Sequence, residues 1–171
     1  MAIIIVEGTM VIYLKPDLYY KNIFEVDFSK LKQQGIKGII CDIDNTIVPW
    51  HENEIMIDVL NWFNEIKGMN FRVCLVSNGL DRRVKYFSKK LDIPGIGRAI
   101  KPRKKAYLIA IAELDINKDK IAVIGDQIFT DILGGNRLGL TTILVDPMNK
   151  KEFITTKFLR IIEKMIFKRN Y

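Results

Sequence analysis

The chain has 171 residues, of which 49% are hydrophobic and 27% are charged, and its formal net charge is +7. This length is enough to bury one hydrophobic core, and the composition excludes a disordered chain. One histidine excludes a histidine-rich metal site, and the two cysteines lack metal-ligand spacing, so we expect both to be core residues in a reducing compartment. The basic excess favours an anionic partner, either a membrane surface or a nucleic acid.

The N-terminal segment is apolar but has no basic flank and no small-residue cleavage site, and it is too short to cross a bilayer. We therefore expect a cytoplasmic protein, with attachment to the inner face of the membrane left open. Translation from either Met1 or Met10 also stays open. We expect a single domain over 1–171, in which 1–35 is an N-terminal extension.

Mainly apolar runs predict four strands that are buried on both faces. They cover residues 36–42, 71–76, 121–124 and 142–145. Helical periodicity lies between them, in 54–67, in 81–91 and from about 103 to 114, with a further helix opening at Thr130 and Asp131. Strands that alternate with helices predict an α/β fold, with a doubly wound, mainly parallel sheet in a three-layer sandwich.

Polar side chains follow three of the predicted strands at the point where each strand ends. Asp42 and Asp44 follow the first, Ser77 and Asn78 the second, and Asp126 the third. The carboxyl ends of parallel strands meet at one edge of a sheet, where open α/β folds bind ligands. Three carboxylates at one place are oxygen ligands for a hard cation, so the sequence predicts a Mg²⁺ site.

Positive charge and hydrogen-bond donors are expected opposite these carboxylates. Ser77, the amide of Asn78 and Lys101 would supply them, and a small cavity between donors and cation suits a phosphoryl group. Asp42 could then act as nucleophile and Asp44 as general acid and base. Taken singly, each signal also has a structural interpretation: a loop-capping aspartate, a capped turn or a solvated basic face.

Together these residues resemble a known family, the haloacid dehalogenase-like (HAD) phosphatases. The four family motifs are matched in order by 42–46, Ser77-Asn78, Lys101-Pro102, and Gly125-Asp126 with Asp131. Two further segments, 14–19 and 125–137, resemble the YqeG branch of that family, which is similar to mitochondrial phosphatidylglycerophosphate phosphatases.

The resemblance implies a Rossmann-like HAD core and a role for each matching residue. Asp42 would be the nucleophile and a metal ligand. Asp44 would be the acid and base, and its backbone carbonyl would bind the metal. The remaining roles are Asp126 as third ligand, Asp131 and Thr46 as supports behind the ligands, and Ser77, Asn78 and Lys101 as phosphate-binding residues.

The spacing of the motifs leaves no room for a cap domain. Residues 45–76 and 79–100 are each accounted for by a loop, a helix and a strand. An open crevice favours a large or immobile substrate. The residues thus predict a Mg²⁺-dependent phosphomonoesterase, and the resemblance implies phosphatidylglycerophosphate at an anionic membrane as its substrate.

Two alternatives stay open. One is a phosphatase for a soluble sugar phosphate, a nucleotide or a nucleic-acid end, and the other is a nucleic-acid-binding protein without turnover. Residues 150–171 are predicted to form a basic amphipathic helix that either binds membrane or docks on the core.

Overall fold

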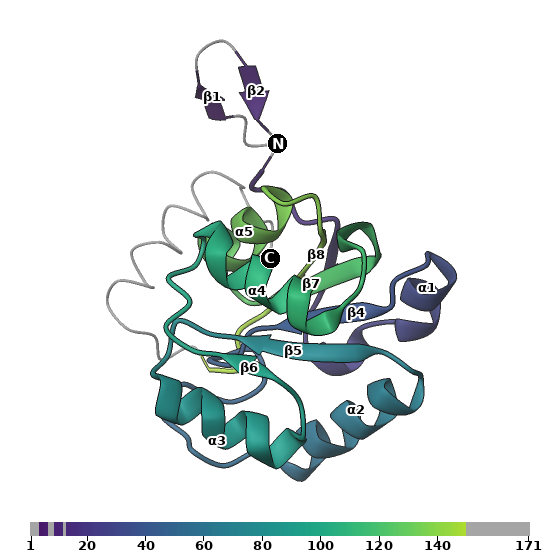
Figure 1. Cartoon of the computed structure of the whole chain (residues 1–171), viewed down its shortest axis with the longest axis vertical. Helices are drawn as coiled ribbons and strands as arrows, with labels where there is room; N and C mark the ends of the chain where they lie inside the picture. The colour runs from purple at the N-terminus through teal and green to yellow at the C-terminus, as the bar shows by residue number, and fades with distance from the viewer. Residues whose placement is uncertain (1–3, 7–8, 12, 150–171) are drawn as a thin grey trace.

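The structure is a computed structural model in which residues 4–6, 9–11 and 13–149 are described (Figure 1). Its main element is a sheet of six parallel strands in the order β3-β8-β7-β4-β5-β6. The strands are β3 (Leu18–Tyr20), β4 (Gly38–Cys41), β5 (Arg72–Val76), β6 (Gly95–Ile96), β7 (Ile121–Gly125) and β8 (Thr141–Val145). Two short strands, β1 (Ile4–Val6) and β2 (Thr9–Val11), pair antiparallel as a separate hairpin.

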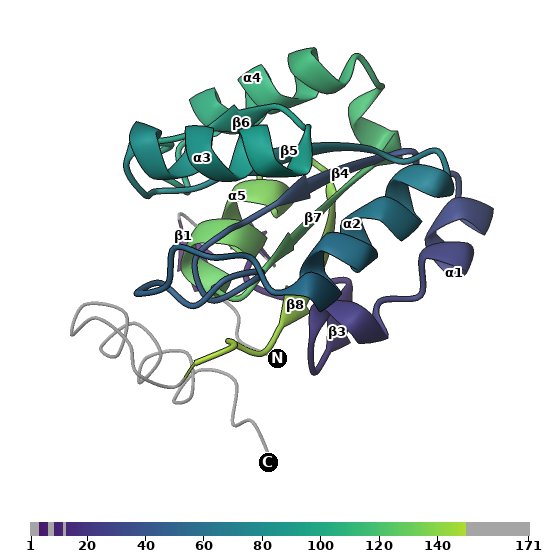
Figure 2. The same ribbon diagram turned by 90° about the horizontal axis from the view of Figure 1, so that it is seen from below.

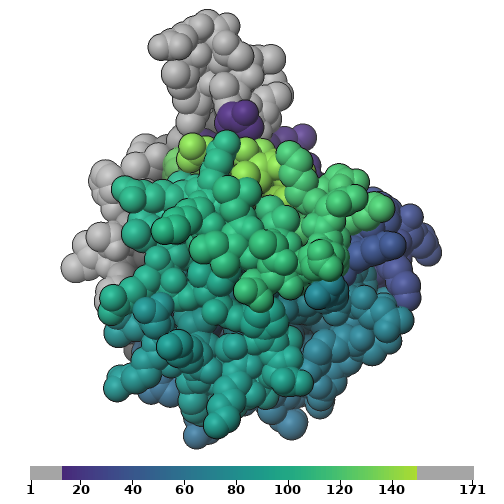
Figure 3. Space-filling model, in the orientation of Figure 1, coloured from purple at the N-terminus to yellow at the C-terminus, as the bar shows by residue number. Residues whose placement is uncertain are grey.

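Helices cover both faces of this sheet (Figure 2). One face packs against α1, α2 and α3, and the other packs against α4, α5 and the π-helical turn η3. In the view of Figure 3, the teal and green residues of the segment around α4 form much of the visible surface. The helices are α1 (Phe28–Gln33), α2 (Ile57–Gly68), α3 (Asp81–Leu91), α4 (Lys104–Leu114) and α5 (Leu133–Asn136), and η3 is Ile128–Ile132.

The central strands are apolar on both faces because both faces are covered. In β4, Ile39 and Cys41 belong to the cluster that includes α2, while Ile40 belongs to the cluster that includes α4. Cys41 and Cys74 are both buried free cysteines, as expected, and burial raises the pKa of Cys74 to about 12. The three-layer parallel α/β fold predicted from the apolar runs is confirmed.

The order of the strands fixes where a ligand crevice can lie. From β4 the chain moves outward through β5 to β6, and it then crosses to the other side of β4 to form β7 and β8. Ligands of doubly wound sheets bind at such a switch point, beyond the carboxyl ends of the strands. In this molecule the switch point lies between β4 and β7. We call this side of the sheet the carboxyl edge, and the side where the strands begin the amino edge.

Several details differ from the sequence prediction. The segment 1–35 contributes an edge strand, β3, which pairs with β8. The helix expected from residue 54 begins at Ile57, and the helix expected from Thr130 begins earlier, with the π-helical turn η3. The predicted tail helix at 150–171 lies outside the described residues. Among the described helices, none combines the length and apolar character needed to cross a bilayer.

Candidate active site

Three buried aspartates meet at the carboxyl edge. Asp42 follows β4, Asp126 follows β7, and Asp131 lies in η3, and each is no more than 5% exposed. One carboxylate oxygen from each of the three lies within 4.8 Å of the others. Carboxylates this close repel one another unless positive charge lies among them.

Lys101 supplies one positive charge to this cluster. Its Nζ donates to Asp42 Oδ1 at 2.6 Å and to Asp131 Oδ1 at 2.7 Å, and its side chain is only 3% exposed. Burial lowers the pKa of Lys101, but the charges of Asp131 and Asp42 outweigh burial and hold that pKa well above the usual lysine value. The group therefore holds three carboxylates against one ammonium, which leaves two negative charges when all four are ionised.

Burial and the neighbouring charges together raise the pKa of Asp42. Burial raises the pKa of Asp42, the Lys101 ammonium lowers it, and the Asp131 charge raises it again, to about 7 in total. A divalent cation beside these oxygens would favour the ionised form. The donor set, with only carboxylate oxygens and no histidine or thiolate, fits Mg²⁺.

The position of Asp131 depends on the glycine that ends β7. A Cβ on Gly125 would lie 2.2 Å from Asp131 Cγ, so only glycine leaves room for this carboxyl group. The backbone N–H of Gln127 donates to Asp131 Oδ2 at 3.2 Å, and the Thr130 hydroxyl lies 3.3 Å from the same oxygen. These contacts fix Asp131 beside Lys101.

Asp44 takes part in a different set of contacts. Its Oδ2 accepts from the Ser77 hydroxyl at 3.1 Å, and its Oδ1 accepts from Arg83 Nε at 2.9 Å. Its side chain is 28% exposed, so it faces the mouth of the crevice more than Asp42 does. Thr46 lies deeper, with its hydroxyl 3.4 Å from both Asp42 Oδ2 and Asp126 Oδ1.

The two predicted phosphate-binding residues after β5 also organise the crevice. The Ser77 hydroxyl accepts from the backbone N–H of Gly79 at 2.9 Å. The Asn78 side chain accepts from the backbone N–H of Lys101 at 2.7 Å, which ties the loop after β5 to the loop after β6. The structure thus brings the eight predicted site residues to one edge, with the carboxylates of Asp42, Asp126 and Asp131 grouped together and that of Asp44 beside Ser77.

The sequence analysis did not single out Arg83, which lies in the first turn of α3. Its guanidinium contacts Asp44 and also donates to the carbonyls of Glu52 and Pro49, at 2.6 and 3.2 Å, and to the side chain of Asn53 at 2.9 Å. These bonds hold the loop after Asp44 against α3. In the sequence Arg83 has no feature that separates it from Arg82.

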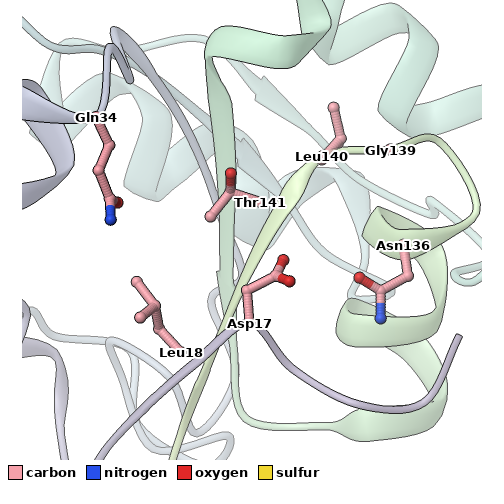
Figure 4. Close-up of a pocket in the computed structure, with 7 residues that line it drawn as sticks. All are labelled: Asp17, Leu18, Gln34, Asn136, Gly139, Leu140 and Thr141. Atoms are coloured by element: carbon pink, nitrogen blue, oxygen red, sulfur yellow. The ribbon is translucent and has the colours of Figure 1, made fainter. Parts of the chain in front are cut away.

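A hollow of about 540 Å³ lies at the amino edge, away from these residues (Figure 4). Asp17 and Asn136 line it, and both are engaged in structural hydrogen bonds. Asp17 Oδ2 accepts from the backbone N–H of Thr142 at 2.8 Å, and Asn136 Nδ2 donates to the carbonyls of Tyr13 and Lys15 at 2.8 and 2.9 Å.

Solved structures share this architecture. A cobalt-bound deoxy-D-mannose-octulosonate 8-phosphate phosphatase from Haemophilus influenzae superposes with a TM-score of 0.55 over 80% of this chain and 90% of its own, at 14% identity. A 3-deoxy-D-manno-octulosonate 8-phosphate phosphatase from Yersinia pestis gives 0.52 over 67% and 66%, at 15% identity. At these identities the likeness is one of fold.

Sequence comparison is more specific. The profile of the HAD-hydrolase-like family matches residues 99–149. The Bacillus subtilis protein named "Probable phosphatase YqeG" is 44% identical over 154 residues, which are 90% of each chain. This chain therefore belongs to the YqeG family of HAD-type phosphatases. A phosphatidylglycerophosphate phosphatase of Arabidopsis thaliana is 26% identical over 92% of this chain, which spans about half (48%) of the plant protein.

Proposed function

We propose that the chain hydrolyses phosphomonoesters with Mg²⁺ through a phosphorylated Asp42, and that its substrate is a lipid phosphomonoester of the phosphatidylglycerophosphate type. The observation that carries the proposal is the environment of Asp42. This buried carboxylate at the end of a central strand contacts the ammonium of Lys101 at 2.6 Å and lies beside two further carboxylates. The excess of negative charge calls for a cation, and the ammonium can face a phosphate.

The carboxylates of Asp42 and Asp126, with the backbone carbonyl of Asp44, would hold the metal, and Asp131 and Thr46 would support them. Bound Mg²⁺ supplies positive charge that neutralises the phosphoryl oxygens during transfer. Lys101 adds a second positive charge at the same group. Since its ammonium already bridges Asp42 and Asp131, it is fixed in place before a substrate arrives.

In the first step a carboxylate oxygen of Asp42 attacks phosphorus, and the bond from phosphorus to the ester oxygen breaks. Asp44, at the mouth of the crevice, gives its proton to the departing alkoxide. In the second step Asp44 takes a proton from water, whose oxygen attacks phosphorus. The bond from phosphorus to Asp42 then breaks, which releases phosphate and restores the Asp42 carboxylate.

Support for a lipid substrate comes from three features. The plant relative named as a phosphatidylglycerophosphate phosphatase matches nearly the whole chain. The +7 net charge suits an anionic membrane surface. Between Asp42 and Lys101 the described chain contains α2, α3, β5, β6 and their loops, with no cap domain that would exclude a substrate fixed in a bilayer.

The proposal is tested by phosphate release from phosphatidylglycerophosphate in mixed micelles, measured against a panel of sugar phosphates, nucleotides and 5′-phosphorylated oligonucleotides. We expect the lipid to have the highest kcat/KM and all turnover to stop with chelator. Turnover of soluble esters alone would contradict the lipid substrate but keep the chemistry. Asp115→Asn, at an exposed aspartate outside the site, is the matched control for Asp42→Asn.

A further inference from the structure

Two large aliphatic side chains are exposed to solvent at the mouth of the proposed crevice. Leu80 is 60% exposed and Ile100 is 58% exposed. Leu80 lies three residues after Ser77, directly before α3, and Ile100 directly precedes Lys101. A single exposed leucine needs no explanation, but these two border a site that the rest of the fold assembles.

The two loops that carry these side chains form one continuous surface. The backbone N–H of Arg98 donates to the carbonyl of Gly79 at 2.8 Å, and the N–H of Ala99 donates to that of Ser77 at 3.1 Å. The loops also approach closely at Gly97, where a Cβ would lie 2.8 Å from the Cα of Asp81. The start of α3 and the segment from β6 to α4 accordingly lie at the same edge of the molecule (Figures 1 and 2).

The backbone at Ile100 holds its side chain outward. Ile100 has a φ of +53° and Arg98 a φ of +45°, and a β-branched residue rarely adopts this left-handed conformation. The next residue, Lys101, is buried and reaches the aspartate cluster. The same turn therefore directs the side chain of Lys101 into the protein and leaves the side chain of Ile100 exposed to solvent.

Charge divides the mouth of the crevice into two halves. Residues 93–112 contain Arg98, Lys101 and three consecutive cations at 103–105, but no acidic residue. Lys101 is buried, while the other four cations are exposed. Arg98, whose side chain is 68% exposed, also forms a surface ion pair with Asp81, the residue after Leu80, at 3.6 Å. Such an exposed pair is weak enough for Arg98 to exchange its partner. On the other half, residues 51–58 contain three acidic residues and neither lysine nor arginine. We call the first half the basic rim, made up of Leu80, Arg98, Ile100, Arg103, Lys104 and Lys105.

We propose that the basic rim docks the crevice mouth on an anionic phospholipid bilayer, with Leu80 and Ile100 entering the interface and the four cations bound to head groups. Exposed aliphatic side chains among cations match an anionic interface. The rim contains no aromatic side chain on which a nucleic-acid base could stack. The inference rests on the proposed function, because docking would bring a lipid phosphomonoester to Asp42.

Sedimentation of the full-length protein with vesicles tests this docking. We expect the wild type to bind vesicles of phosphatidylglycerol and phosphatidylcholine and to remain in solution with phosphatidylcholine alone. The double variant Leu80→Asn with Ile100→Asn should bind the anionic vesicles at least about tenfold more weakly. Asparagine suits both a helix N-cap and a left-handed backbone, so we expect this variant to fold.

The matched control is Ile57→Asn, which removes a 66% exposed aliphatic side chain from the acidic half. It should bind vesicles within about twofold of the wild type, while Arg98→Gln with Arg103→Gln should weaken binding as the rim double variant does. Equal loss in the control and the rim variants would overturn the proposal. The proposal would also be overturned if the rim variants bind vesicles as tightly as the wild type does. Binding of single-stranded RNA by a wild type that shows no preference for anionic vesicles would overturn it as well.

A soluble phosphomonoester separates this proposal from the proposed function. We expect the rim variants to keep the wild-type kcat on that ester. Hydrolysis that continues while rim variants bind vesicles normally would overturn the docking alone. If the wild type hydrolyses no phosphomonoester but binds vesicles only when the basic rim is intact, the proposed function alone would be overturned.

Discussion

The two edges of the parallel sheet differ in a way that bears on where function lies. The amino edge has a hollow of about 540 Å³, yet the polar groups named there hold the N-terminal segment and β8 together. The carboxyl edge gathers three aspartates and one lysine, all buried. Burying charge is costly, so three buried carboxylates grouped around one ammonium point to a ligand more strongly than the size of a hollow does.

Removing one carboxylate from each edge tests whether activity depends on the carboxyl edge alone, and it has the largest expected effect. Asp42→Asn should lower the kcat for phosphate release by about 10⁴-fold, because an amide cannot form the phosphorylated intermediate. Asp17→Asn, at the amino edge, should stay within about twofold of the wild type. Retention of more than about a tenth of the activity by Asp42→Asn would show that the nucleophile is another residue.

The pH dependence of stability should report the burial of Asp42 at the carboxyl edge. In the metal-free protein the pKa of Asp42 is raised from 3.8 to about 7, so the folded state binds more protons than the unfolded state between these values. The free energy of unfolding should therefore fall as pH rises from about 4 to 7, by up to about 4 kcal/mol.

Thermal unfolding of chelator-treated protein across this pH range measures the effect. The decline in the free energy of unfolding should be smaller in Asp42→Asn, and Mg²⁺ at pH 8 should raise the Tm of the wild type. An identical pH profile in the wild type and Asp42→Asn would contradict the environment described for this carboxyl group.

Arg83 offers a smaller test within the carboxyl edge. Arg83→Gln should lower kcat on a soluble ester by about 10- to 100-fold, because the guanidinium both contacts Asp44 and holds the loop that follows it. Arg82→Gln, which changes the exposed neighbour, should leave kcat within about twofold. If both variants behave alike, Arg83 does not position Asp44.

The smallest effect is expected at the amino edge. Asp17→Ala removes an acceptor for the backbone N–H of Thr142 and should lower the free energy of unfolding by about 1 kcal/mol, without changing kcat. Chemical denaturation and the phosphate-release assay measure the two quantities. A loss of activity greater than the loss of folded protein would show that the amino edge contributes to catalysis, contrary to the account of the two edges.

The sequence predicted the central sheet well because β4, β5, β7 and β8 are buried on both faces along most of their length and are therefore mainly apolar. It did not predict β3, whose three residues alternate in exposure and whose partner in β8 is more than 120 residues away. The sequence of Leu18–Tyr20 has no local feature that predicts pairing with β8. Edge strands with distant partners are fixed by the fold as a whole.

At the site, the sequence placed the strand-end residues, since parallel topology brings strand ends together. It did not show how the side chains divide, with Asp131 joining Asp42 and Asp126 while Asp44 lies with Ser77 and Arg83. That division depends on the space left by Gly125 and on the loop held by Arg83. Both are tertiary contacts that spacing along the chain cannot reveal.

Calorimetric titration of the metal-free protein with Mg²⁺ tests the central claim most directly. We predict one bound ion per chain in the wild type and in Asp17→Asn, and binding at least about tenfold weaker in Asp126→Asn. In the wild type, the Mg²⁺ concentration that gives half-maximal phosphate release should equal the Kd for Mg²⁺ measured by calorimetry. Unchanged Mg²⁺ binding in Asp126→Asn would contradict the placement of the metal among the buried aspartates of the carboxyl edge.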